Sequence, residues 1–69
     1  MTEFTTVLYS RIEAAQQGLA LARQAGDDRE IHRHSARLLD LLDRAAATDV
    51  NTTGWVAPAV LDVAAGHCA

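Results

Sequence analysis

The side chains best suited to bind a metal ion are three histidines and one cysteine: His32, His34, His67 and Cys68. In a helix, His32 and His34 point about 200° apart, because each residue turns by about 100°. Helical metal ligands are normally three or four positions apart, so this pair does not fit one ion. His67 and Cys68 are adjacent near the end of the chain, where fraying is common. We therefore predict no metal site and no cofactor.

The nucleophilic side chains lack the neighbours that catalysis needs. Cys68 is the only cysteine, so no disulfide can form within the chain. Ser10 and Ser35 fall inside predicted helices with no base at a supporting spacing, and no glycine-rich loop follows a strand. A chain of 69 residues also offers little volume for a concave pocket. We predict no enzymatic activity and no small-molecule substrate.

A row of four arginines lies on the outer side of the predicted second helix: Arg29, Arg33, Arg37 and Arg44. Such a row could contact phosphates, so a small nucleic-acid-binding regulator is the alternative function. However, six acidic residues accompany these four arginines across residues 27–49. Ion pairs at helical spacing favour a solvated face instead, with Glu30 paired to Arg33 and His34, and Asp40 paired to Arg37 and Arg44. The net charge of −3 also disfavours nucleic acid and anionic membranes.

An apolar stripe at steps of three and four predicts a first helix over residues 3–25: Phe4, Leu8, Ile12, Ala15, Leu19 and Ala22. Beside it lies a second row of mostly small side chains: Val7, Ala14, Gly18 and Ala25. Gly18 costs a helix about 1 kcal/mol relative to alanine. Either it occupies an exposed position where this cost is tolerated, or it lets another helix approach closely. Leu21 lies away from the main stripe and is either a single exposed leucine or a second contact.

Residues 26–27 predict a tight turn, and residues 28–48 a second helix. Gly26 suits the left-handed position after a helix, and Asp27 can cap the next helix with Glu30 three residues on. So short a connection makes the two helices antiparallel neighbours. The second helix carries a central stripe with a flank on each side: Ile31, Ser35, Leu38, Leu42 and Ala45 at the centre, Leu39 and Ala46 on one flank, and Leu41 on the other. This stripe is wider than one partner helix covers, so it requires a further helix, from this chain or another.

Turn-forming residues predict a loop over 49–56, followed by a short third helix over 57–65 and a tail over 66–69. Pro58 fits the first turn of that helix, and Gly66 marks its end. Two helical turns are not stable alone, so this segment must dock on the helix pair, with Trp55 as its anchor.

The sequence therefore predicts an all-α single domain: an antiparallel two-helix hairpin plus a short C-terminal helix, which forms half of a dimeric four-helix arrangement. The predicted function is a protein–protein interaction module or regulatory subunit, whose partner is a second copy or another helical protein.

Membrane partners are not expected, because no apolar run approaches the roughly 18 residues of a membrane span. The chain starts without a secretory signal and its basic residues are all arginine, which indicates a cytoplasmic protein from a GC-rich bacterial genome. The predicted interaction surface comprises Phe4, Leu8, Ile12, Leu19, Leu38, Leu39, Leu41, Leu42 and Trp55.

Overall fold

The computed structural model describes the backbone of residues 2–68 and the side chains of residues 2–66. Three helices make up the fold: α1 (Glu3–Ala25), α2 (Asp28–Ala47) and α3 (Pro58–Cys68). No strand occurs in the part of the chain that the structure describes. The predicted all-helical class is confirmed, and the molecule measures 36 × 20 × 17 Å along its principal axes.

The first helix buries one face and begins at a capped end. The hydroxyl of Thr2 accepts a hydrogen bond from the amide of Thr5 at 3.1 Å, which satisfies one free donor of the first turn. The buried residues recur at helical spacing, as the sequence predicted: Leu8, Ile12, Ala15, Leu19 and Ala22. Phe4 does not join them, because its side chain is 51% exposed. It lies in the first turn of α1, and α2 ends too early to cover it.

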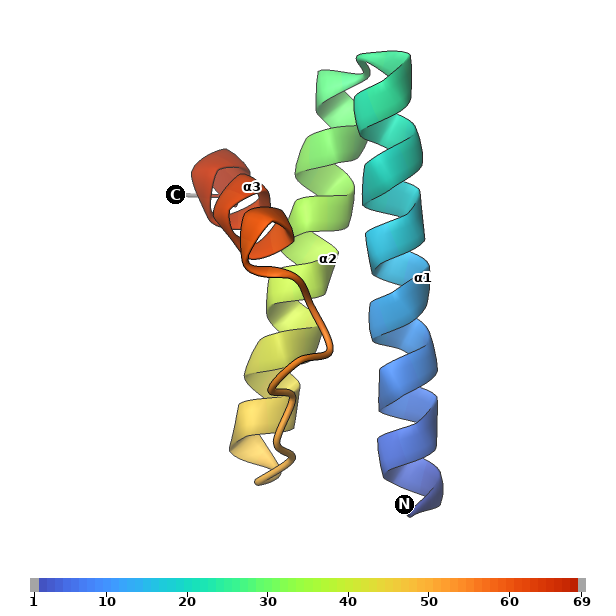
Figure 1. The fold of residues 1–69 in the computed structure, drawn as a ribbon, viewed down its shortest axis with the longest axis vertical. Helices are drawn as coiled ribbons and strands as arrows, with labels where there is room; N and C mark the ends of the chain where they lie inside the picture. The colour runs from blue at the N-terminus through green and yellow to red at the C-terminus, as the bar shows by residue number, and fades with distance from the viewer. Residues whose placement is uncertain (1, 69) are drawn as a thin grey trace.

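A two-residue connection reverses the chain after α1. Gly26 adopts the left-handed conformation with φ 66°, and the amide of Asp27 donates to the carbonyl of Ala22 at 3.1 Å. Asp27 then caps α2 by accepting a hydrogen bond from the amide of Glu30 at 3.2 Å. These are the roles predicted for Gly26 and Asp27. As a result α1 and α2 lie side by side and run in opposite directions (Figure 1).

The second helix lies at the centre of the fold. Its buried residues are Ile31, Ser35, Leu38, Leu41 and Ala45. Leu41 is therefore more deeply buried than Leu42, which the sequence placed at the centre of the stripe, while Leu39 and Leu42 pack against the core from its edge. Ala46 was predicted to widen the stripe but is exposed. The hydroxyl of Ser35 is buried and has no hydrogen-bond partner among the described residues.

The second helix ends one residue earlier than predicted, in a well-defined C-terminal motif. The amide of Asp49 donates to the carbonyl of Ala46 at 3.2 Å, and that of Val50 to the carbonyl of Ala45 at 2.8 Å. Asp49 between them has a φ of 62°. This is the Schellman arrangement, in which the left-handed position usually holds glycine.

The loop after α2 is tied to α1. The side-chain amide of Gln16 donates to the carbonyl of Trp55 at 2.9 Å, and the rings of Tyr9 and Trp55 meet edge to face with centroids 5.1 Å apart. Trp55 is thus the anchor that the sequence predicted. Beyond it, α3 runs from Pro58 to Cys68, so the predicted helix end at Gly66 is wrong. Gly66 continues the helix because glycine disfavours a helical interior without forbidding it.

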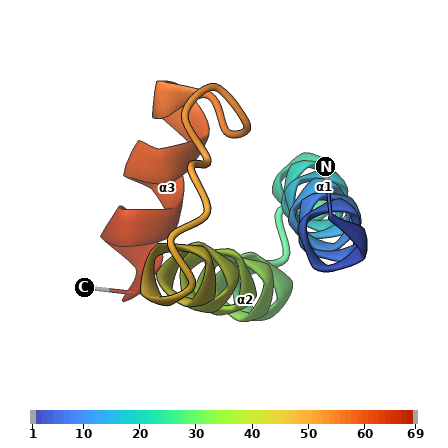
Figure 2. The same ribbon diagram turned by 90° about the horizontal axis from the view of Figure 1, so that it is seen from below.

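The third helix supplies the additional cover that α2 requires. Val56 and Ala64 are buried, and Val60, Leu61 and Val63 pack against the same core. Figure 2 shows α1 and α3 on different sides of α2 and apart from each other, and their mutual contact is slight. The wide apolar stripe of α2 is therefore covered by two helices of its own chain.

Candidate functional site

Most residues of the predicted interaction surface face the interior of the chain. Five of them are buried in its own core: Leu8, Ile12, Leu19, Leu38 and Leu41. Leu39, Leu42 and Trp55 are partly buried against that core, which leaves Phe4 as a largely exposed member. The prediction of these residues as a partner-facing surface is corrected accordingly. The leucines of α2 need no second molecule to cover them, because α3 does so.

The large apolar side chains that remain exposed lie on α1. Phe4 is 51% exposed, Val7 44% and Leu21 65%. They belong to a row at alternating steps of three and four, which we call the outer seam of α1: Phe4, Val7, Arg11, Ala14, Gly18, Leu21 and Ala25. This spacing keeps all seven side chains on one side of the helix, next to its buried face, and is the spacing with which helices pair in coiled coils.

The seam borders α2 at one close contact. A Cβ atom placed on Gly18 would lie 2.5 Å from Cε1 of His34, so the imidazole occupies the space that a side chain at position 18 would need. Nε2 of His34 lies 3.4 Å from a carboxylate oxygen of Glu30. The predicted pairing of His34 with Glu30 is present, and the space at Gly18 is filled by the imidazole of His34.

Two hollows open along the groove between α1 and α2, on either side of His34. The first, of about 260 Å³, has a floor of Ala14 and Ala15 and a rim of Arg11, Arg33, Arg37 and His34; we call it the cationic hollow. The second, of about 240 Å³, is lined by Gly18, Leu21, Ala22, Ala25, Asp27, Glu30 and His34; we call it the acidic hollow. Neither is lined by a residue of α3, so this groove lies on a side of the helix pair that α3 leaves open.

Some arginines near the groove between α1 and α2 form ion pairs, and others do not. Arg33 donates to Glu30 at 2.8 Å, and Arg44 pairs with Asp40 at 3.2 Å. Arg11 and Arg37 have no ion pair with any side chain that the structure describes, so the predicted pairing of Asp40 with Arg37 is absent. The cationic hollow therefore holds guanidinium groups that can still accept an anionic partner.

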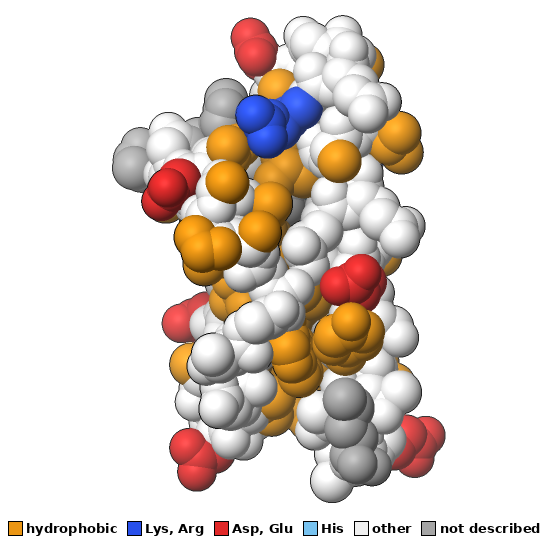
Figure 3. Space-filling view, in the orientation of Figure 1, with side chains coloured by type: hydrophobic (Ala, Val, Ile, Leu, Met, Phe, Trp, Pro, Cys, Tyr) orange, Lys and Arg blue, Asp and Glu red, His pale blue; other side chains and the backbone are white. Residues whose placement is uncertain are grey.

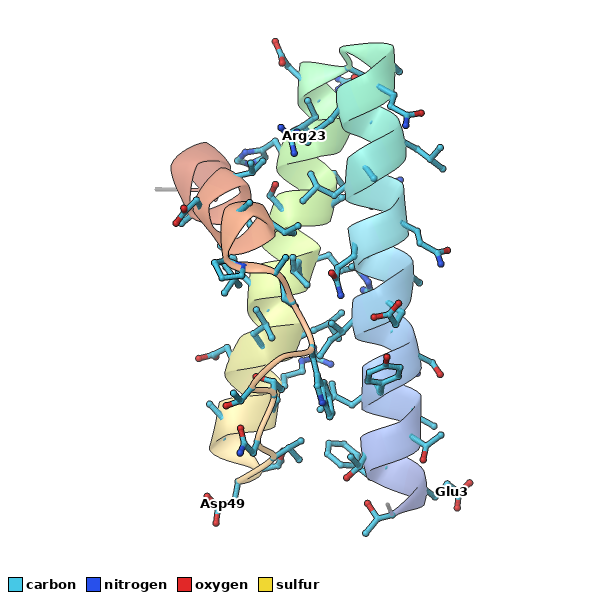
Figure 4. All side chains as sticks on the ribbon, viewed as in Figure 1. Glu3, Arg23 and Asp49 are labelled. Carbon is cyan, nitrogen blue, oxygen red and sulfur yellow. The ribbon has the colours of Figure 1, made fainter. Side chains whose placement is uncertain are left out.

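The opposite face of the molecule also carries apolar side chains. Figure 3 shows them running down the middle of that face, and Figure 4 labels Arg23 toward the top of the same view. The apolar residues of this region, such as Trp55 and Val60, pack against the core. Tyr9, whose ring meets that of Trp55, is itself 38% exposed.

The structure offers no catalytic arrangement among the residues it describes. No three His, Cys, Asp or Glu side chains of residues 2–66 are grouped closely enough to hold a metal ion. Ser35 is buried, while Ser10 is exposed. The side chains of His67 and Cys68, the other predicted metal candidates, lie outside the described residues. None of the described helices combines the length and the apolar character that crossing a bilayer demands.

Comparison with known proteins identifies no relative: no family model, curated protein or solved structure matches this chain. The chemistry of the outer seam and the two hollows is thus the basis on which function can be argued.

Sequence reasoning missed two components of this surface. It assigned Phe4 to the core stripe, although Phe4 also continues the row of Val7, Ala14 and Gly18. It also considered the arginines of the second helix without Arg11. The signal for both was the alternating spacing of the seam, which includes Arg11 and Leu21 at regular positions.

Proposed function

We propose that this protein is a small helical interaction module that acts by binding, with no catalysis of its own, and that it self-associates through the outer seam of α1. The observation that carries the proposal is the row of large apolar side chains, Phe4, Val7 and Leu21, that no element of the described chain covers. Exposed apolar side chains aligned along one helix face are typical of a helix-docking surface.

The proposed assembly is a homodimer in which the α1 and α2 helices of two copies form a four-helix arrangement. The open groove lies on a side that α3 does not line. Two copies can therefore meet through α1 while each α3 stays outside. Ala14 presents only a methyl group in the middle of the seam, which allows the helix of the second copy to lie close at that position.

A cytoplasmic setting completes the proposal. The single cysteine cannot form a disulfide within the chain, and stability would come instead from helix packing and association. A reducing compartment suits such a protein.

Charge placed in the seam tests the proposal. Leu21→Arg puts a guanidinium at the most exposed of the three large apolar side chains of the seam, and we expect it to raise the dissociation constant of the dimer by at least about tenfold. Ala20→Arg is the matched control, because Ala20 is the exposed neighbour on another side of the same helix. Melting temperature measured over a wide range of protein concentration reports both effects, since only an associating chain melts at higher temperature when concentrated. Concentration-independent melting of the unaltered chain would rule out self-association.

The cationic hollow supports one alternative, which is binding of nucleic acid through Arg11, Arg33 and Arg37. In that case a nucleic acid probe binds at low salt, and its affinity falls steeply as salt is added. The absence of binding at low salt would exclude this function.

A further inference from the structure

The groove beside the outer seam is self-complementary in charge, and the following inference rests on the function proposed above. The cationic hollow lies next to the Arg11 half of the seam, and the acidic hollow next to the Leu21 half. A two-fold axis perpendicular to α1 turns the second copy end for end. It therefore sets the cationic half of one copy against the acidic half of the other. A groove with opposite charges at its two ends favours a second copy of the same chain as its occupant.

The heptad spacing of the seam restricts how two antiparallel copies can align. When one α1 helix slides along the other, seam residues of the two copies face each other again only after a shift of seven residues, which is about 10 Å along the helix. One alignment sets Leu21 of one copy against Arg11 of the other, Ala14 against Gly18, and Val7 against Ala25, while Phe4 extends past the last seam residue of the other copy. The layer of Leu21 with Arg11 joins two long side chains, the layer of Val7 with Ala25 joins a larger side chain to a smaller one, and the smallest pair lies near the two-fold axis.

This alignment also gives Arg11 an acidic partner. Leu21 and Glu30 line the same hollow. The aliphatic stem of Arg11 from the other copy, lying on Leu21, can extend its guanidinium group into that hollow. The side chain of Glu30 is 35% exposed, so its carboxylate is accessible beside its own Arg33 and His34. Each dimer contains this contact twice, and it gives Arg11 a carboxylate partner that the described side chains of its own chain do not provide.

Two competing alignments bring like charges together, and a third, shifted by one heptad in the other direction, sets Leu21 against Gly18 but carries Val7 and Arg11 past the end of the other copy's seam. A shift by one heptad sets Arg11 against Ala14 of the other copy, on the floor of the hollow that Arg33 and Arg37 border. A parallel arrangement in register places the two Arg11 side chains beside each other. Both arrangements are disfavoured by electrostatic repulsion in a partly desolvated groove.

We propose that two copies pair antiparallel along the outer seam in the alignment that places Arg11 of each copy beside Glu30 of the other. Arg11 and Glu30 are then the residues that select both the partner and the register.

Two charge-reversed variants test this pairing because they complement each other only across the interface. Alone, Arg11→Glu and Glu30→Arg each place like charges at both contacts, and we expect each to weaken self-association by about tenfold or more. Mixed in equal amounts, they restore both contacts, so the mixture forms a heterodimer within about threefold of the original affinity. Sedimentation equilibrium measures the three affinities, and circular dichroism of dilute samples verifies that each variant remains helical. The control mixture pairs Glu30→Arg with Arg23→Glu, a reversal outside both hollows; its heterodimer regains only one of the two contacts and therefore stays weaker than the complementary heterodimer.

The outcomes separate this inference from the function on which it rests. A dimer whose affinity is unchanged by either reversal, or a mixture that is no tighter than its components, would overturn the Arg11–Glu30 pairing and leave self-association standing. A chain that stays monomeric at every concentration, as expected if the groove receives a different protein or nucleic acid, would overturn both.

Discussion

The contact between Gly18 and His34 yields a quantitative prediction about stability. Replacing a helical glycine by alanine normally stabilises an exposed helix by about 1 kcal/mol. Here the added methyl group would lie 2.5 Å from the imidazole of His34, and the ring must rotate away before it fits. Gly18→Ala therefore loses the packing of the ring on α1 and its contact with Glu30. Each such loss is worth from a few tenths to about 1 kcal/mol. We expect the two effects to cancel, so that Gly18→Ala changes the free energy of unfolding by less than about 0.5 kcal/mol.

A double-mutant cycle isolates this interaction. In a His34→Ala background the imidazole is absent, so Gly18→Ala should give the full gain of about 1 kcal/mol. Urea unfolding followed by circular dichroism, at the lowest usable protein concentration, measures all four proteins free of association. The coupling energy between positions 18 and 34 should be about 0.5–1 kcal/mol. A gain of about 1 kcal/mol for Gly18→Ala in both backgrounds would show that the imidazole does not pack on Gly18.

Two further substitutions address the interior and the end of α2. Ser35→Ala removes a buried hydroxyl that lacks a hydrogen-bond partner, and we expect it to raise the free energy of unfolding by about 1 kcal/mol. The exposed Ser10→Ala is its control, and a loss of stability in Ser35→Ala would show that the hydroxyl is hydrogen-bonded after all. Asp49 is a non-glycine residue at φ 62°, and it places a negative charge at a helix C-terminus. Asp49→Gly removes both unfavourable features, so we expect thermal denaturation to show a free energy of unfolding about 1 kcal/mol higher. A drop in melting temperature would argue against the left-handed conformation at Asp49.

The long helices were predictable because local rules and core burial agree along them. The apolar stripe of α1 follows a helical period, and Gly26 with Asp27 combines a helix end and a helix cap in two adjacent residues. The third helix was harder to bound. Gly66 was read as a stop, although the decision between stopping and continuing depends on packing that the sequence does not display locally.

The location of the interaction surface was predictable only in part. The sequence showed that α2 carries more apolar surface than one helix covers, but it did not indicate whether α3 or a second molecule supplies the cover. The hollows combine residues from both helices, such as Arg11 with Arg37. Their grouping depends on the register between α1 and α2, which the contact of Gly18 with His34 fixes. The alignment of α1 against α2 cannot be deduced from the sequence alone and is given by the structure.

The mass of the unaltered protein in solution is the most direct test of self-association through α1. Sedimentation equilibrium over a thousandfold range of concentration should show the mass rising from that of one chain to that of two, with no change in helix content. A single-chain mass throughout, from a fully helical protein, would contradict the account.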